Sequence, residues 1–177
     1  MACWLLHGSN RQNEKIRSDV ILTQVSDTMH GFLEERQATL HLELNPGPLE
    51  VRASPLQLEL ALVNLVRNAI ESRPQGAEVS VRATCHDTWA VVQIEDNGPG
   101  LTPEQREHLF DPFYTTRIRE GGTGLGATVA YAIVQQHGGR IEVHTRLGVG
   151  TRMEVWLPLT MAKEDQKESP TDACSVS

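Results

Sequence analysis

Apolar residues recur along this chain with two different periods, and these periods predict where helices and strands lie. Three segments carry apolar residues at the spacing of a helix face, namely residues 20–36, 55–72 and 125–137. Strands are expected at residues 39–44, 78–84, 89–95, 140–145 and 151–157, with a short returning strand at 49–52. Because the helices and strands do not strictly alternate, we expect an α+β fold with helices on one face of a mixed sheet.

Local signals place the ends of these elements. Ser54 followed by Pro55 is typical of a helix N-cap, and Gly138-Gly139 is typical of a helix end. Residues 45–48 (Asn-Pro-Gly-Pro) and a site near residues 86–87 are expected to be turns. Thr102-Pro103-Glu104-Gln105 predicts a further short helix that reaches about residue 109.

The two ends of the chain lack these periods. Residues 1–18 mix polar and basic side chains and are interpreted as a leader or linker remnant. Residues 161–177 are polar and poor in apolar side chains, so a disordered tail is expected there. The folded domain is accordingly placed at residues 19–160.

Composition excludes several classes of protein. A formal net charge of -7 argues against a nucleic-acid-binding surface, where clustered positive charge is expected. The three cysteines show no metal-ligand spacing, and free thiols in a reducing cytoplasm are the simplest interpretation. No apolar run approaches the roughly 18 residues of a membrane span. We therefore expect a cytoplasmic domain without membrane contact.

Two asparagines stand out within the predicted helix 55–72. Asn64 and Asn68 lie four residues apart, so both amides lie on one side of the helix among apolar side chains. Because an unpaired buried amide costs about 1–3 kcal/mol, each needs a partner. They are either structural amides bonded to nearby backbone, or ligands that offer an oxygen to Mg²⁺, which prefers oxygen.

Glycine-rich segments follow two other predicted elements. Asp96 comes directly after a strand and precedes Asn97-Gly98-Pro99-Gly100, where it is either a turn-former or an acceptor for the amine of a flat ring. Residues 121–126 lead into the helix at 125–137, whose first N–H groups suit phosphate oxygens. The chain lacks the lysine of a P-loop and the strand-turn-helix context of a dinucleotide fingerprint.

Taken in order, five segments resemble the motifs of a known family. They are Asn64-Leu65-x-x-Asn68-Ala69 (N box), Asp96-x-Gly98-x-Gly100 (G1 box), Phe110-Asp111-Pro112-Phe113-Tyr114 (F box), Gly122-x-Gly124-Leu125-Gly126 (G2 box) and Gly148-x-Gly150-Thr151. Residues 20–159 resemble the ATP-binding catalytic domain of bacterial sensor histidine kinases. That domain shares the Bergerat fold with DNA gyrase, MutL proteins and a heat-shock chaperone. The resemblance implies a two-layer α/β sandwich with a mostly antiparallel sheet and an ATP lid.

The resemblance also implies roles for single residues. Asn68 would ligate Mg²⁺ with Asn64 beside it near the phosphates of ATP, and Arg117 or Arg119 would reach the γ-phosphate. These roles make Asn64, Asn68 and Arg117 the candidate catalytic residues.

The remaining motif residues would hold the nucleotide. Asp96 would accept from the adenine amine with Thr151 beside it, while Gly98 and Gly100 would admit the base. Phosphate contacts would come from Gly122, Thr123, Gly124, Leu125 and Gly126, under a mobile lid at about residues 114–121. Phe110 and Phe113 would anchor that lid, a role compatible with ordinary core packing.

One position distinguishes the branches of this superfamily. The ATP-hydrolysing branch has a glutamate base four residues before the magnesium asparagine, where this chain has Asn64. An amide cannot take a proton from water, so the site should hold ATP for transfer to another nucleophile.

The nucleophile itself is expected outside this chain. None of the seven histidines has the helical, acid-flanked setting of a phosphoacceptor, and surface or capping roles are expected for them. The predicted function is transfer of the γ-phosphate to a histidine on a separate dimerisation hairpin, with a response regulator downstream, by a module that is monomeric alone. Two alternatives remain, an anti-sigma-factor serine kinase and a non-catalytic interaction module switched by nucleotide.

Overall fold

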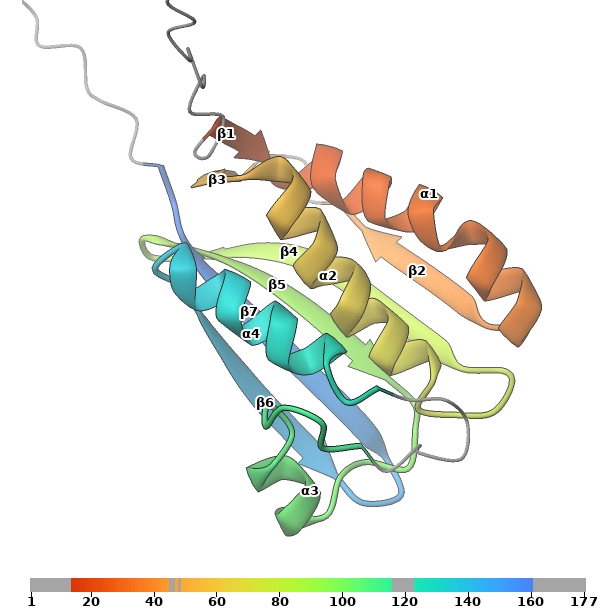
Figure 1. Cartoon of the computed structure of the whole chain (residues 1–177). Helices are drawn as coiled ribbons and strands as arrows, with labels where there is room; N and C mark the ends of the chain where they lie inside the picture. The colour runs from red at the N-terminus through yellow and green to blue at the C-terminus, as the bar shows by residue number, and fades with distance from the viewer. Residues whose placement is uncertain (1–13, 45–46, 48, 116–122, 161–177) are drawn as a thin grey trace, which may run out of the picture.

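A five-stranded sheet forms the centre of the domain (Figure 1), in a computed structural model that describes residues 14–44, 47, 49–115 and 123–160. Its strand order is β2 (Thr39–Glu43), β4 (Glu78–His86), β5 (Trp89–Asp96), β7 (Gly150–Pro158) and β6 (Arg140–Arg146). Only the β2–β4 pair is parallel, and the other three pairs are antiparallel. The predicted mixed and mostly antiparallel sheet is confirmed.

Three helices cover one face of this sheet, as Figure 1 shows. They are α1 (Ser18–Arg36), α2 (Pro55–Ile70) and α4 (Gly126–Gln136), while the short α3 (Pro103–Glu107) lies near the end of the sheet, away from the three. Apolar side chains from alternate positions of β4, β5 and β7 meet the helices, and Leu65, Val79 and Val155 are fully buried. The predicted two-layer α/β arrangement is therefore confirmed.

A second, two-stranded sheet differs from expectation. Strand β1 (Glu14–Arg17) lies within the range assigned to the leader, and it pairs antiparallel with β3 (Glu50–Ala53). With only Ile16 buried among its four residues, β1 is too short to show an alternating pattern. The segment expected to return from β2 therefore pairs with β1 instead, while β2 joins β4.

Helix ends follow the predicted signals with one addition. Ser54 precedes α2 as expected, but its side chain makes no cap hydrogen bond; its backbone N–H instead donates to Nε2 of His137 at 3.1 Å. Nδ1 of the same ring lies 2.8 Å from the carbonyl oxygen of Ile133. Because Nε2 accepts, the proton resides on Nδ1, which donates to that carbonyl. His137 thus joins the end of α4 to the start of α2, the capping role expected of it.

Thr102 and Gln105 form a capping box at the start of α3, in which each side chain bonds the backbone N–H of the other residue. This confirms the predicted short helix, which ends at Glu107 rather than near residue 109. Among the helices of the described residues, none is both long and apolar enough to cross a membrane.

Candidate nucleotide-binding site

The two asparagines of α2 face the first residue of α4. A Cβ placed on Gly126 would lie 2.9 Å from Oδ1 of Asn64 and 3.7 Å from Oδ1 of Asn68. Nδ2 of Asn64 donates to the carbonyl oxygen of Leu60 at 2.8 Å, which fixes the amide so that its oxygen turns toward α4. The nitrogen of Asn64 is therefore bonded to nearby backbone, as one of the two interpretations expected. The amide oxygens of Asn64 and Asn68 both lie beside Gly126, in a space that a side chain at that position would fill.

The start of α4 supplies hydrogen-bond donors beside these oxygens. Leu125 occupies the N-cap position, and no side chain caps the helix there. The first N–H groups of a helix have no partner within it and carry partial positive charge, so this end suits an anion. Thr123 and Gly124 lead into it. The two amide oxygens of α2 thus lie beside the uncapped start of α4.

Asp96 lies at the end of β5, where its side chain is buried at 8% exposure. Its Oδ1 accepts from the backbone N–H of Gly98 at 2.8 Å, which is the turn-forming role predicted as one alternative. Burial raises the pKa of this carboxyl group above its ordinary value, and bonds from the backbone of Gly98 and Thr151 partly oppose that rise. The hydroxyl of Ser72 also lowers this pKa, although its geometry does not satisfy a hydrogen bond.

Ser72 occupies the space that a side chain at Gly98 would fill beside this carboxylate. A Cβ at that position would collide with Oγ of Ser72 and lie 2.7 Å from Oδ1 of Asp96. At Gly100, by contrast, a Cβ would meet the backbone carbonyl of Arg146 in the β6–β7 turn. The first glycine lets Ser72 pack beside the carboxylate, and the second lets two loops approach each other.

Thr151 is the partner of Asp96 across the β5–β7 pair, and it is buried at 6% exposure. Its hydroxyl lies 3.1 Å from the hydroxyl of Thr145, which also accepts from the backbone N–H of Leu101 at 2.8 Å. Sequence reasoning did not identify Thr145 or Ser72. A cross-strand match of residues 145 and 151 around the β6–β7 turn would have indicated Thr145, whereas Ser72 carries no sequence signal.

The two phenylalanines of the F box have different surroundings. Phe110 stacks on Tyr131 of α4, with ring centroids 4.9 Å apart. Phe113 does not pack into the core, because its side chain is 75% exposed. Its backbone N–H instead donates to the carbonyl oxygen of Gly124 at 3.1 Å. The F box is therefore held to α4 and to the glycine-rich segment by one ring and one backbone bond.

Some predicted residues lie outside the described part of the chain. They are Arg117, Arg119 and Gly122, with most of the expected lid. The structure brings together the asparagine pair with the start of α4, and Asp96 with Gly98 and Thr151.

A hollow of about 230 Å³ lies elsewhere on the domain. Its lining includes Asp96 and Thr151, but also Glu95, His144 and Arg152, which alternate to the sheet face opposite the helices. Neither asparagine of α2 lines it, so we do not equate this hollow with the nucleotide site. The hollow reaches Asp96 and Thr151 where β5 ends and β7 begins.

Comparisons with known proteins agree with these arrangements. The chain matches the model of the family described as histidine kinase-, DNA gyrase B- and HSP90-like ATPase over residues 53–161. It is 35% identical over 151 residues to the sensor histidine kinase CpxA of Escherichia coli (strain K12), covering 83% of this chain and 33% of that protein.

Solved structures show the same fold. The catalytic domain of the histidine kinase ThkA has a TM-score of 0.74 and 25% identity, covering 83% of this chain and 95% of that chain. Full-length ShkA, solved in complex with AMPPNP, has a TM-score of 0.75 and 22% identity, covering 91% of this chain and 33% of that chain.

The chain spans about a third of the length of CpxA, the curated relative compared above. The family match includes the asparagine pair, Asp96, the start of α4 and Thr151. By this match, the chain belongs to the family of histidine kinase-, DNA gyrase B- and HSP90-like ATPases.

Proposed function

We propose that this chain binds Mg-ATP and transfers the γ-phosphate to a histidine on a separate phosphoacceptor hairpin, as the catalytic module of a two-component signalling kinase. The observation that carries this proposal is Asn64, which occupies the place of the hydrolytic glutamate. Its amide is fixed by Leu60 and presents an oxygen toward α4. A neutral amide there orients a ligand and cannot activate water.

The residues present fit a magnesium nucleotide. The amide oxygen of Asn68 would ligate Mg²⁺, a hard ion that selects oxygen ligands, with Asn64 beside it near the phosphates. Bound there, Mg²⁺ would neutralise charge on the transferring phosphoryl group. The N–H groups at the start of α4 would bind the phosphate oxygens facing them.

The other end of the site would select the base. The carboxylate of Asp96 would accept from the adenine amine, with the Thr151 hydroxyl beside it. The position of Asp96 at the end of β5, opposite Thr151, supports this role. Guanine has an oxygen where adenine has its amine, so a fixed carboxylate would repel it.

Transfer itself would depend on position rather than on a base from this chain. Phosphoryl transfer proceeds roughly in line, and holding both reactants in place removes much of the barrier. The proton of the attacking imidazole would go to an acidic group beside the acceptor histidine. A response regulator would then take the phosphoryl group from that histidine.

The experiment that tests this function supplies the missing acceptor. The purified chain is incubated with γ-labelled ATP, Mg²⁺ and a panel of acceptor hairpins from sensor kinases. We expect an acid-labile, base-stable label on the hairpin, and none on a hairpin whose acceptor histidine is replaced by glutamine. The Asn68→Ala variant should bind nucleotide without dependence on Mg²⁺ and should transfer no label.

Other outcomes would favour the alternatives. An acid-stable label on an added serine-containing acceptor would indicate a serine kinase of the anti-sigma type. Mg-ATP binding without transfer to any acceptor would indicate an interaction module switched by nucleotide. Arg82→Ala is the matched control for Asn68→Ala. It changes an exposed residue on the opposite face of the sheet and should leave transfer unchanged, so that a loss in Asn68→Ala alone is not due to handling or misfolding.

A further inference from the structure

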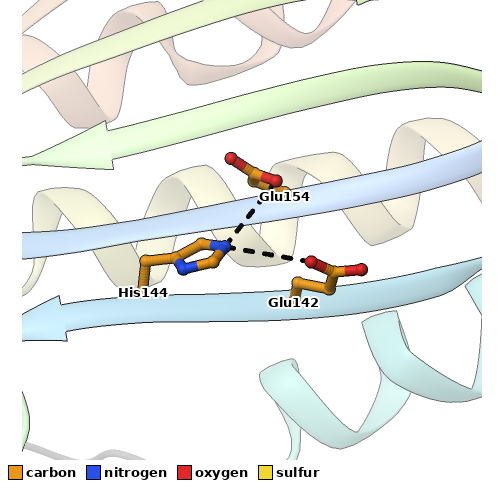
Figure 2. Close-up of side chains that lie close together, drawn as sticks. All are labelled: Glu142, His144 and Glu154. Carbon is orange, nitrogen blue, oxygen red and sulfur yellow. Dashed lines mark ion pairs between the residues drawn. The ribbon is translucent and has the colours of Figure 1, made fainter. Parts of the chain in front are cut away.

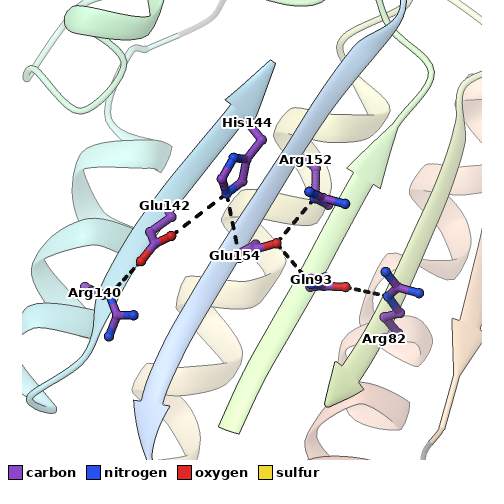
Figure 3. Close-up of polar contacts among 7 residues, drawn as sticks. All are labelled: Arg82, Gln93, Arg140, Glu142, His144, Arg152 and Glu154. Carbon is purple, nitrogen blue, oxygen red and sulfur yellow. Dashed lines mark hydrogen bonds and ion pairs between the residues drawn. The ribbon is translucent and has the colours of Figure 1, made fainter. Parts of the chain in front are cut away.

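The sheet face opposite the helices carries a connected group of polar side chains. Figure 3 shows them running across β4, β5, β7 and β6 in the order Arg82, Gln93, Glu154 with Arg152, His144, Glu142 and Arg140. Within this group, Glu142, His144 and Glu154 form what we call the open-face cluster (Figure 2). The nucleotide site uses none of the three.

Strand register brings the cluster together. Glu142 on β6 lies directly opposite Glu154 on β7, and His144 follows Glu142 by two residues on the same face. Like charges placed directly opposite each other destabilise a strand pair, so this arrangement calls for something to offset it. Glu154 is also buried at 7% exposure, which increases the cost of its charge.

Three side-chain atoms of the cluster lie at ion-pair distances from one another, beyond the range of a hydrogen bond. Nε2 of His144 lies 3.9 Å from Oε2 of Glu142 and 3.7 Å from Oε2 of Glu154. All three atoms lie within 4.8 Å of one another. These separations exceed the roughly 2.7–3.2 Å of a hydrogen bond. The three atoms therefore surround a common point rather than forming a bonded pair.

The other oxygen of each carboxylate, Oε1, contacts side chains outside the cluster. Oε1 of Glu142 accepts from Nε of Arg140 at 2.7 Å. Oε1 of Glu154 accepts from Nε2 of Gln93 at 3.0 Å and lies 3.3 Å from Nε of Arg152. Such outer contacts are what orient carboxylate ligands in metal sites. The arginines offset the carboxylate charges, but they bond one oxygen of each group and leave the other turned toward His144.

We propose that Glu142, His144 and Glu154 bind a divalent transition-metal ion, with Zn²⁺ as the best match. One imidazole nitrogen and two carboxylate oxygens are a donor set that zinc accepts, at bond lengths of about 2.0–2.2 Å. Tetrahedral bonds of that length place ligands about 3.4 Å apart. Small rotations of the side chains would close the present 3.7 and 3.9 Å separations to that value.

The surroundings leave room for a fourth ligand. His144 is exposed and lines the hollow of about 230 Å³, together with Arg146 and Arg152. Water or a small anion entering from this hollow would complete the coordination. The metal would link β6, the edge strand, to β7 on the face away from the nucleotide site. If the metal binds the folded chain and not the unfolded chain, it would raise the free energy of unfolding in proportion to the logarithm of metal concentration.

The test is calorimetric titration of zinc chloride into the full chain without nucleotide. Cys3, Cys85 and Cys174 are first replaced by serine, because thiolates bind zinc strongly. We expect one zinc ion per chain, with affinity reduced at least about tenfold in His144→Ala and in Glu142→Gln. The matched control is His41→Ala, which removes an exposed strand histidine on β2 and should leave zinc affinity unchanged.

Co²⁺ titration gives an independent readout, because its visible absorption reports the geometry of its ligands. Absence of zinc binding would overturn the proposal and leave the cluster as an ion-pair network only. Binding that both cluster variants leave unchanged, or that His41→Ala weakens equally, would also overturn it. Thermal melting of each variant without metal separates loss of the site from loss of the fold. If His144→Ala does not fold, the zinc affinity of Glu142→Gln tests the proposal.

Discussion

The two faces of the five-stranded sheet use polar residues in opposite ways. On the face that packs against the helices, the middle of the sheet is apolar, and the polar residues Asp96 and Thr151 lie where β5 and β7 meet at the strand end. On the open face, Arg82, Gln93 and Glu154 lie in mid-strand and bond to one another. Polar groups on the first face therefore lie where apolar packing stops, whereas those on the second lie in mid-strand and contact one another.

This difference has an energetic meaning. Burial of one large aliphatic side chain stabilises a fold by about 1.5–3 kcal/mol. An exposed ion pair contributes about 0–1 kcal/mol. The helix-covered face thus determines whether the domain folds, and the open face can vary its charges at small cost. The following substitutions test that division, beginning with the largest expected effect.

Leu65→Ala removes a fully buried side chain that lies between the two asparagines in sequence. We expect the free energy of unfolding to fall by about 2–5 kcal/mol, because a cavity forms where the side chain was. Chemical denaturation without nucleotide measures this loss. Leu60→Ala on the same helix is the control, since its side chain is 48% exposed and should cost much less. Equal losses of unfolding free energy in the two variants would show that burial does not determine how much each face of α2 contributes to stability.

Asp96→Asn tests a buried acid of the helix-covered face. We expect ATP affinity to fall about 10–100-fold, because a hydrogen bond to a charged acceptor is lost. Discrimination against GTP should fall as well. Calorimetric titration with both nucleotides measures these changes. Glu95→Gln, the exposed neighbour that alternates to the open face, should leave both unchanged.

The same variant has a stability prediction of opposite direction. Burial raises the pKa of Asp96 in the folded chain, so its charged form is penalised by folding. The stability that this group contributes is complete below the ordinary aspartate pKa and is lost as pH rises through the raised folded value. Asp96→Asn should therefore melt at or above the parent temperature at neutral pH without nucleotide. A fall of many degrees would instead make Asp96 chiefly a structural turn-former.

Arg82→Ala should have the smallest effect. It removes the donor to Oε1 of Gln93 at an exposed position of β4, and we expect a change of about 0–1 kcal/mol. Chemical denaturation without nucleotide measures it. A loss as large as that of Leu65→Ala would break the comparison between the two faces.

Much of the helix-covered face could be predicted from the sequence. Helical spacing located α2 and α4, and strand alternation located β5 and β7, because those patterns reflect burial on one side. Asn64, Asn68 and Asp96 were found because polar residues interrupt apolar runs or follow them directly. Each segment alone left a structural alternative open, and only the order of all five segments indicated the roles of these residues.

What sequence reasoning missed depends on register between distant segments. Strand β1 has four residues and one buried side chain, so only its pairing with β3 reveals it. His144 reads as a surface histidine until pairing of β6 with β7 places Glu154 beside it. Phe113 looks like a core residue by type, yet its left-handed backbone, at φ 65°, accompanies an exposed side chain.

The strand order has a consequence for how the domain folds. Strands β4 and β5 form one hairpin and β6 and β7 another, each from neighbouring segments, whereas β5 and β7 pair across more than 50 residues of chain. Closing that long loop costs more entropy than either hairpin, so this pairing should form late. Asp96 meets Thr151 only through it. A partly folded chain would therefore lack the pairing of Asp96 with Thr151. If these residues bind the base as proposed, nucleotide added during refolding should stabilise the finished domain without accelerating formation of its hairpins.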